Sequence, residues 1–331
     1  MAYEREREVA IAAVREAGAL CRTVQSRIDG AVLEKKDRSP VTVADFGSQA
    51  LVCRALAEAF PDDPVIAEED AAVLREADNA ALLQRVCGHV QDHRPGTDDA
   101  TVCAWIDRGC ASAYSPRFWT LDPIDGTKGF LRGGQYAVAL ALIVEGELTV
   151  AAMACPNMPT DEWAGEAPDP EKDGAIFSAV RGQGAAMTPM RSTGAGAPIS
   201  ASSTTDPGTA RFCESVEAEH SSHSDAAAVA KALGIAREPI RLDSQAKYAT
   251  VARGLADIYL RLPTRAGYVE KIWDHAAGAL VVIEAGGRVT DIEGRELDFS
   301  HGYQLETNRG MIVTNGHLHT VVLDAVRKQL G

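Results

Sequence analysis

The chain has 331 residues, of which 46% are apolar and 24% are charged. This composition is ordinary for a globular protein and excludes disorder of the whole chain, because it supplies enough apolar side chains for a sizeable core. The 33 Lys and Arg against 47 Asp and Glu give a net charge of −14, which argues against non-specific nucleic-acid binding and against docking on anionic membranes.

No apolar run in the sequence is long enough to cross a bilayer. The longest, Ala137–Val144, has eight residues, whereas a membrane-spanning helix needs about 20. The N-terminal residues carry charges of both signs and lack the apolar stretch of a signal peptide. The seven cysteines are scattered without a C-x-x-C pair, which is typical of reduced thiols. We therefore expect a cytoplasmic protein without a membrane or nucleic-acid partner.

The first half of the chain predicts helices followed by strands. Apolar residues recur at spacings of three and four over residues 3–28, which predicts an amphipathic helix. A second helix is expected over 44–60, where Pro61 ends it. Residues 71–113 are expected to be mostly helical. Strands are expected at 65–67, 118–121, 135–144, 147–154 and 175–180.

A segment rich in Gly, Ala, Pro and Thr, residues 188–198, is the best candidate for a linker. Beyond it helices and strands alternate. The expected helices are 225–233, 245–254, 274–285 and 317–330, and the expected strands are 199–201, 211–213, 240–243, 257–262, 288–292 and 311–314. The length allows about two domains. We therefore divide the chain into an α+β half, residues 1–195, and an α/β half, residues 196–331.

The most informative segment follows the strand expected at 118–121. It contains Asp122 and Asp125, three positions apart across a turn, and then Gly126 and Thr127. Both carboxylates can converge on one point, and carboxylates with a backbone carbonyl are the ligands that Mg²⁺ prefers. The backbone N–H groups of Gly126 and Thr127 are suited to a phosphate oxygen. Taken alone, the same pattern also fits a capped turn.

Other acidic positions stand out beside this segment. The run Glu68–Asp70 follows an expected strand, Asp274 opens an apolar helix, and Asp45 lies at the start of another helix. Each has an ordinary structural explanation, which is a solvated loop for the run and a helix N-cap for each aspartate. Their spacing in the sequence does not show that they meet in space.

Three motifs together resemble a known family. Ala67-Glu68-Glu69, Asp122-Pro-Ile-Asp-Gly-Thr127 and Trp273-Asp-His-Ala-Ala-Gly278 resemble the lithium-sensitive, Mg²⁺-dependent phosphatases of the inositol monophosphatase superfamily. The motifs occur in the family's order, and the resemblance covers nearly the whole chain. One departure is Ala67, where Gly is commoner. The resemblance implies a layered αβαβα sandwich of the sugar-phosphatase kind, a phosphoric monoester hydrolase and lithium sensitivity. We also expect a monomer.

The resemblance also assigns roles to residues. It implies two or three Mg²⁺ ions, with metal ligands at Glu68, Asp122, Asp125, Asp274 and the carbonyl of Ile124. Glu69 would lie close by, either behind these ligands or on a third metal. Asp45 and Thr127 resemble the pair that activates the attacking water, so they are the expected catalytic residues. The chemistry agrees, because crowded carboxylates repel one another unless divalent cations neutralise them.

Segments of the second half resemble one branch of the superfamily, the 3′(2′),5′-bisphosphate nucleotidases, which remove the 3′-phosphate from adenosine 3′,5′-bisphosphate. These segments are His220–His223, Leu242–Tyr248, Tyr259–Pro263 and Glu270–Asp274. Lys-Gly after Thr127 also fits this branch, since inositol monophosphatases usually carry Thr-Asn there. By this match the substrate-binding residues are Thr127, His220, Ser244, Lys247, Arg261 and Asp274.

A bisphosphate carries a second dianion that the metal ions do not reach, so another part of the pocket must be positively charged. Lys247 and Arg261 are the candidates. Taken singly, each could equally be an ordinary surface charge, and Arg261 also fits an outward position on a strand. His220 and His223 lack the H-E-x-x-H context of a zinc site.

The sequence thus predicts a Mg²⁺-dependent phosphatase that converts adenosine 3′,5′-bisphosphate to AMP. We expect 3′-phosphoadenylyl sulfate, the sulfur-assimilation donor, as a second substrate. The first alternative is an inositol monophosphatase or an inositol 1,4-bisphosphate 1-phosphatase, which shares the metal chemistry. The second is a non-catalytic sensor of the nucleotide, against which the intact pair Asp45 and Thr127 counts.

Overall fold

Helices and strands alternate along most of the chain, of which the computed structural model describes residues 2–27, 33–34, 40–41, 43–161, 173–216, 222–265 and 267–330. The helices are α1 (Glu4–Gln25), α2 (Val43–Ala59), α3 (Ala80–His93), α4 (Asp99–Asp107), α5 (Thr127–Leu131), α6 (His223–Ala232), α7 (Ala246–Ala252), α8 (Ala276–Glu284) and α9 (His319–Leu330).

The strands form two large sheets and one short pair. The pair is β1 (Leu33–Glu34) with β2 (Pro40–Val41). The seven-stranded sheet has the order β3 (Val65–Ala67), β4 (Arg117–Asp125), β5 (Ala137–Val144), β6 (Glu147–Cys155), β7 (Ala175–Val180), β8 (Ala185–Pro189) and β9 (Ala197–Ile199). The five-stranded sheet has the order β11 (Ile240–Arg241), β10 (Phe212–Glu214), β12 (Ile258–Arg261), β14 (Met311–Thr314) and β13 (Arg288–Thr290).

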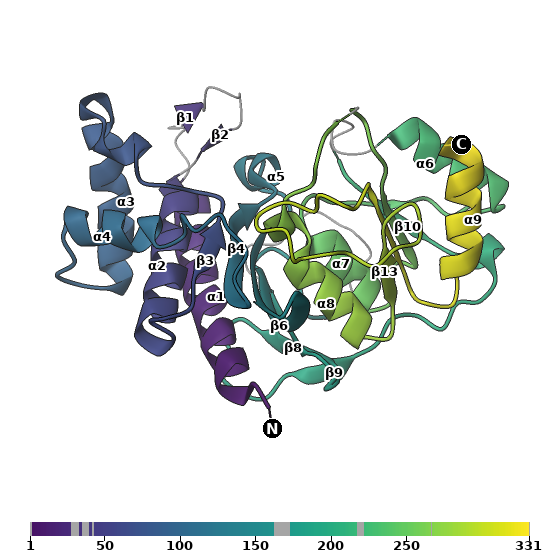
Figure 1. Cartoon of the computed structure of the whole chain (residues 1–331), viewed down its shortest axis with the longest axis horizontal. Coiled ribbons are helices and arrows are strands. Elements are labelled where there is room, and N and C mark those ends of the chain that lie inside the picture. The colour runs from purple at the N-terminus through teal and green to yellow at the C-terminus, as the bar shows by residue number, and fades with distance from the viewer. Residues whose placement is uncertain are drawn as a thin grey trace.

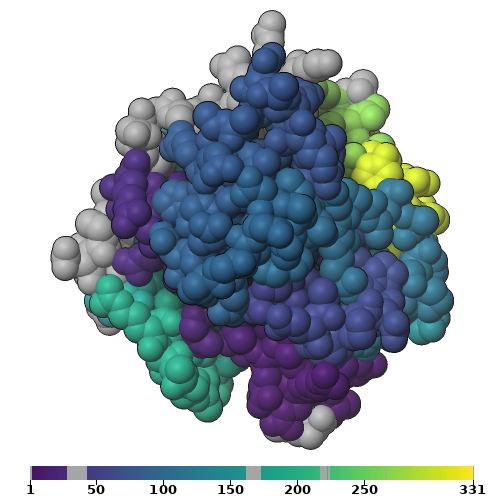
Figure 2. Space-filling model, turned by 90° about the vertical axis from the view of Figure 1, so that its left-hand side faces the viewer, coloured from purple at the N-terminus to yellow at the C-terminus, as the bar shows by residue number. Residues whose placement is uncertain are grey.

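The two large sheets alternate with layers of helices, as Figure 1 shows from left to right. Helices α1 and α2 cover the outer face of the seven-stranded sheet, and α3 and α4 lie outside α2. Helices α7 and α8 fill the space between the sheets, and α6 and α9 cover the far face of the five-stranded sheet. The expected αβαβα sandwich is confirmed. Figure 2 faces the α3 and α4 end, where these blue residues cover the centre of the surface.

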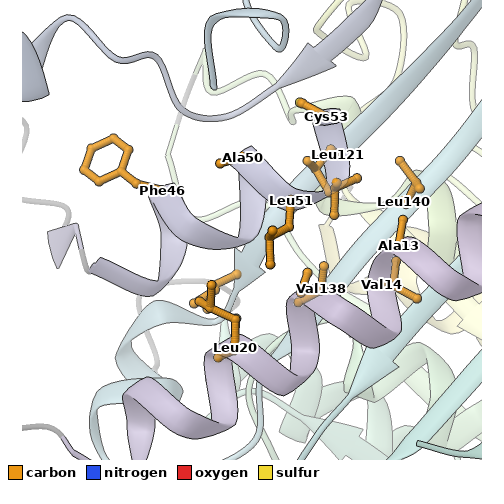
Figure 3. Packing of buried hydrophobic residues seen from close by; sticks show 14 of the residues in the cluster. Ala13, Val14, Leu20, Phe46, Ala50, Leu51, Cys53, Leu121, Val138 and Leu140 are labelled. Atoms are coloured by element: carbon orange, nitrogen blue, oxygen red, sulfur yellow. The ribbon is translucent and has the colours of Figure 1, made fainter. Parts of the chain in front are cut away.

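Figure 3 shows the core between the first helices and the seven-stranded sheet. Leu20 of α1 and Leu51 of α2 point toward Val138 and Leu140 of β5 and toward Leu121 of β4. All five side chains are fully buried, and each contributes roughly 1.5–3 kcal/mol relative to an exposed position. The β5 strand is buried on both faces, which explains its continuous apolar sequence. This packing fixes the strand that carries the central aspartates.

The middle helices join the two sheets. Residues Ala276–Val282 of α8 are all buried, because the helix packs on both the seven-stranded and the five-stranded sheet. Gly278 allows α7 to approach, since a Cβ on Gly278 would lie 2.5 Å from Cγ of Tyr248. Any side chain at Gly278 would therefore force the two middle helices apart.

The structure changes several expected elements. The first helix ends at Gln25 rather than near residue 28, and residues 71–113 hold α3 and α4 with short 3₁₀ turns before them. The expected linker, residues 188–198, is wrong, because β8 continues to Pro189 and β9 pairs with it as an antiparallel edge strand. The chain passes from one sheet to the other between Ile199 and Phe212. The division into residues 1–195 and 196–331 stays a prediction.

Within the part of the chain that the structure describes, no helix combines the length and the apolar character that crossing a bilayer requires.

Candidate active site

The end of β4 forms a sharp acidic turn. Its pairing with β5 shifts register between Asp122 and Asp125, and Gly126 then turns the chain with a φ of 86°. A Cβ on Gly126 would lie 2.9 Å from Cβ of Ser244. Glycine is required at this position both for its positive φ and for the close approach of the segment that holds Ser244.

Asp122 is the most buried carboxylate of this turn. Its side chain is 2% exposed, and its Oδ1 atom is buried with no hydrogen-bond partner. Burial raises the pKa of Asp122 well above its usual value, and the neighbouring carboxylates raise it further. In order of effect, these neighbours are Glu68, Asp125, Asp274 and Asp45. The charges of the predicted acidic residues therefore act together on Asp122, whose Oδ1 atom lacks a hydrogen-bond partner.

Two further oxygens of the turn have defined partners. The Asp125 Oδ2 atom accepts a hydrogen bond from the backbone N–H of Gln245, with an N···O distance of 2.5 Å. The carbonyl of Ile124 accepts one from the Thr127 hydroxyl at 3.2 Å. Thr127 is the first residue of α5, so its hydroxyl lies directly beside the turn.

The Glu68 and Glu69 pair is held in place by α2. Gln49 of this helix accepts a hydrogen bond from the N–H of Glu69 at 3.0 Å and donates one to the carbonyl of Ile106 at 2.9 Å. Glu69 is buried, whereas Glu68 is exposed. Asp45 lies one turn before Gln49 on the same helix and is also buried. Gln49 thus fixes the Glu pair relative to Asp45, a role that the sequence analysis missed.

Asp274 connects this acidic group to a nearby cation. Its Oδ2 atom lies 3.6 Å from Nη2 of Arg261. Burial raises the pKa of Asp274 to about 6, although Arg261 acts in the opposite direction. Because Arg261 is the last residue of β12 and Asp274 precedes α8, the contact joins the central strand of the five-stranded sheet to the middle layer.

Arg261 is fixed by a second carboxylate. Its Nε donates to Glu270 Oε1 at 3.0 Å, and its Nη2 lies 2.7 Å from Glu270 Oε2. The same Oε2 lies 3.2 Å from Nε2 of His275, whose Nδ1 lies 2.8 Å from the Tyr248 hydroxyl. Burial acts to raise the pKa of Glu270, but Arg261 and His275 outweigh this effect and lower the pKa to about 2. Glu270 therefore carries a charge that offsets the charge of Arg261.

One cluster among the described residues has metal-ligand spacing: Glu270, Asp274 and His275 offer ligand atoms within 4.8 Å of one another. Both oxygens of Glu270 and both ring nitrogens of His275 already have partners, so the cluster is better explained as an ion-pair network. The expected ligands Glu68, Asp122, Asp125 and Asp274 are not gathered within that limit, but their charges act on one another at Asp122. An oxygen-only donor set around the partnerless Asp122 oxygen fits Mg²⁺.

Of the expected cations of the substrate site, Lys247 is buried and Arg261 is half-buried. Lys247 of α7 is 4% exposed, and its Nζ lies 3.5 Å from the carbonyl of Leu242 and 5.2 Å from the ring centroid of Tyr259. Burial lowers the pKa of Lys247, and the charge of Asp125 acts against this shift. The surface-charge explanation is therefore wrong for Lys247, and it is wrong for Arg261 too, because that guanidinium is enclosed by carboxylates.

The structure brings together every expected site residue that it describes. Ser244 lies against Gly126, Lys247 lies within the field of Asp125, and Arg261 contacts Asp274. His220 lies outside the described residues. The sequence analysis assigned no role to the residues that support the site, which are Gln49, Gln245, Tyr248, Glu270 and His275. In the sequence these residues are only polar side chains in or near the segments of the expected site residues, and their burial is known from the structure alone.

Comparison with known proteins shows similarity to the inositol monophosphatase family along nearly the whole chain. The model of the inositol monophosphatase family matches residues 2–330. A 3′(2′),5′-bisphosphate nucleotidase of Emericella nidulans is 46% identical over 100% of this chain and 99% of its own. Another 3′(2′),5′-bisphosphate nucleotidase, from Schizosaccharomyces pombe, is 42% identical over 98% of this chain and 96% of its own.

Solved structures share the fold at lower identity. An IMPase of Thermotoga maritima has a TM-score of 0.65 at 22% identity and covers 97% of this chain and 96% of its own. The extragenic suppressor protein suhB of Bartonella henselae has a TM-score of 0.66 at 20% identity, with 97% of each chain covered. At these identities the likeness concerns the fold alone.

Proposed function

Because the chain belongs to the inositol monophosphatase family, we propose that it is a Mg²⁺-dependent 3′(2′),5′-bisphosphate nucleotidase. It hydrolyses the 3′-phosphate of adenosine 3′,5′-bisphosphate to give AMP, and it also acts on 3′-phosphoadenylyl sulfate. The observation that carries this proposal is the effect of several carboxylates on the buried Asp122, beside the cations Lys247 and Arg261. Full-length relatives that bear the name of this activity support the choice of substrate.

The acidic group is suited to hold two or three Mg²⁺ ions. The ligands in this proposal are Glu68, Asp122, Asp125, Asp274 and the Ile124 carbonyl, with Glu69 close by. Bound Mg²⁺ would neutralise these carboxylates, hold the phosphate and lower the pKa of a bound water. The partnerless Oδ1 of Asp122 supports this assignment, since a buried charged oxygen without a partner is costly.

Asp45 and Thr127 are the proposed catalytic pair. The Thr127 hydroxyl would accept a hydrogen bond from the attacking water while donating its own hydrogen to Asp45, so that the water loses a proton as it attacks phosphorus. In the structure this hydroxyl donates to the Ile124 carbonyl instead. Because a hydroxyl has one hydrogen, the relay requires it to turn toward Asp45, which leaves the Ile124 oxygen available as a metal ligand.

The second phosphate of the substrate accounts for both cations. Lys247 and Arg261 are the proposed ligands of that phosphate, because a dianion requires positive charge that the acidic group does not supply. Ser244 and His220 complete the nucleotide site in this proposal, Thr127 also contacts substrate, and Asp274 contacts both metal and substrate. The buried position of Lys247 supports a role inside the site rather than on the surface.

The proposal also covers inhibition, location and biological role. We expect inhibition by lithium, a cytoplasmic monomer and a role in sulfur assimilation. We also assign residues 1–195 to a metal-binding catalytic half and residues 196–331 to a nucleotide-binding half, although β9 (Ala197–Ile199) pairs within the seven-stranded sheet.

The decisive experiment measures phosphate release from two esters with and without Mg²⁺. Faster turnover of adenosine 3′,5′-bisphosphate than of inositol 1-phosphate, lost when Mg²⁺ is removed, is the expected result. Faster turnover of inositol 1-phosphate would instead support the inositol phosphatase alternative. Absence of phosphate release from either ester at millimolar Mg²⁺ would support a sensor of the nucleotide.

A further inference from the structure

Gln245 connects the two acidic motifs through three hydrogen bonds. Its backbone N–H donates to Asp125 Oδ2 at 2.5 Å. Its side-chain Nε2 donates to the carbonyl of Trp273 at 2.9 Å, and its Oε1 accepts from the N–H of Gly278 at 2.9 Å. The residue is 1% exposed, so none of these groups has water as an alternative partner.

The two side-chain bonds enclose Asp274 along the chain. Trp273 is the residue before it, and Gly278 lies in the first turn of α8. The N–H groups of a first turn have no partner within their helix, and the residue at the N-cap, His275, makes no side-chain capping bond. The amide of Gln245 therefore caps α8 from another helix and fixes the turn that carries Asp274.

The segment around Gln245 is closely packed against both acidic turns. Gly126 lies against Ser244, the residue before Gln245, and Gly278 lies against the ring of Tyr248, three residues after it. The start of α7 is thus enclosed between the turn of Asp125 and the turn of Asp274. A shift of Gln245 would move one carboxylate relative to the other.

An amide is the side chain that this position requires. An amide has both a donor and an acceptor. Here the donor pairs with the Trp273 carbonyl and the acceptor pairs with the Gly278 N–H. A glutamate would offer the acceptor only, would leave the Trp273 carbonyl without its donor, and would add a negative charge next to Asp125 and Asp274.

We propose that Gln245 is a positioning residue that sets the separation of Asp125 and Asp274 and thereby the affinity for the divalent cation. The inference rests on the proposed function, because it takes both aspartates as metal ligands. Removal of partners behind metal ligands typically lowers metal affinity 10- to 100-fold. The side chain of Gln245 itself does not contact substrate in this proposal.

The test is a measurement of Mn²⁺ binding by electron paramagnetic resonance on the intact protein without substrate. Gln245→Met conserves volume and removes both side-chain bonds, so we expect roughly 10- to 100-fold weaker Mn²⁺ binding. In assays, the Mg²⁺ concentration for half-maximal activity should rise by the same factor, with kcat at saturating Mg²⁺ changed less.

Asn315 provides a matched control. It is also 1% exposed, and its amide likewise joins two backbone groups, the carbonyl of Thr204 at 2.8 Å and the N–H of Leu318 at 3.1 Å. It follows the end of β14 where Thr314 pairs with Ile258, at the opposite end from Arg261. Asn315→Leu should lower stability but leave Mn²⁺ affinity unchanged.

Gln245→Glu separates positioning from charge. An added carboxylate would strengthen cation binding by charge alone, whereas loss of the Trp273 bond should weaken it. We expect weaker binding, and this variant also serves if Gln245→Met does not fold. Wild-type affinity in Gln245→Met, or tighter binding in Gln245→Glu, would overturn the inference. Normal Mn²⁺ binding by wild type without hydrolysis of the bisphosphate would overturn only the proposed function.

Discussion

Arg261 and Glu270 face each other through two nearly parallel contacts, at 3.0 Å from Nε to Oε1 and at 2.7 Å from Nη2 to Oε2. This arrangement holds the guanidinium in one plane and leaves Nη2 3.6 Å from Asp274. The pair therefore aims a fixed positive charge at the acidic group, and it is more enclosed than the pair of Arg241 with Glu214, whose arginine is exposed.

Replacing Glu270 should show how much this pair matters. We expect Glu270→Gln to lower the free energy of unfolding by about 3 kcal/mol, because it leaves the enclosed Arg261 without its main counter-charge. Urea denaturation measures this change. The matched control, Glu214→Gln, breaks a pair whose arginine, Arg241, is exposed, and it should cost less than about 1 kcal/mol. Equal effects of the two variants would contradict the prediction.

Lys247 should distinguish the nucleotide from other phosphate esters. Lys247→Met keeps the buried volume and removes the charge, so kcat/KM for adenosine 3′,5′-bisphosphate should fall by roughly 10- to 150-fold, the range for a lost charged hydrogen bond. Inositol 1-phosphate has no second phosphate, and its hydrolysis should change by less than about threefold. Steady-state assays on both esters check this, and a similar loss on both would remove Lys247 from the specificity site.

The proposed water-activating pair predicts a loss of turnover without a loss of metal. Asp45→Ala and Thr127→Ala should each lower kcat by about 10²- to 10⁴-fold, the usual range for loss of a general base, while Mn²⁺ binding stays as in wild type. Thr127→Ser retains the hydroxyl and should keep most of the activity. Unchanged kcat in both alanine variants would exclude the pair from the mechanism.

His319 predicts a pH dependence of stability far from the acidic group. The Thr290 hydroxyl donates to the Asp291 carbonyl at 2.9 Å, so it accepts from Nε2 of His319 at 3.0 Å. The other ring nitrogen lies 3.1 Å from the Thr314 hydroxyl. Burial and, to a lesser extent, the charge of Arg288 lower the pKa of His319 to about 4. The ring is therefore neutral in the folded chain.

The sign follows from linkage. The unfolded chain binds the proton at a pKa near 6.5, above the folded value, so stability is complete above about pH 6.5 and is lost as the pH falls toward 4. We expect wild type to lose about 2 kcal/mol more than His319→Gln between pH 7 and pH 4.5 in urea denaturation. His317→Gln, at an exposed position, should follow wild type. Parallel pH curves for wild type and His319→Gln would contradict the assignment.

The predictable part of the site lies within single motifs. Asp122, Asp125 and Gly126 are separated by so few residues that a strand followed by a turn places them together, and the resemblance then supplied the fold. The enclosure of Lys247 and Arg261 was not predictable, because it depends on Tyr259, Glu270 and Asp274 from other segments.

The edge of the first sheet shows why one expectation failed. Residues 188–198 have the composition of a loop, yet β9 forms there with Pro198 opposite Ala186. Proline lacks a backbone donor and is tolerated in an edge strand, and β9 is the last strand of its sheet. A composition typical of a loop therefore does not exclude an edge strand, because such a strand pairs with a neighbour on one side only.

The position of α8 has a consequence for the movement of the two halves. Its apolar side chains pack on both sheets at once, so swinging the halves apart like a hinge would expose this shared interior to water. Helix α8 therefore holds the two sheets together and opposes such an opening.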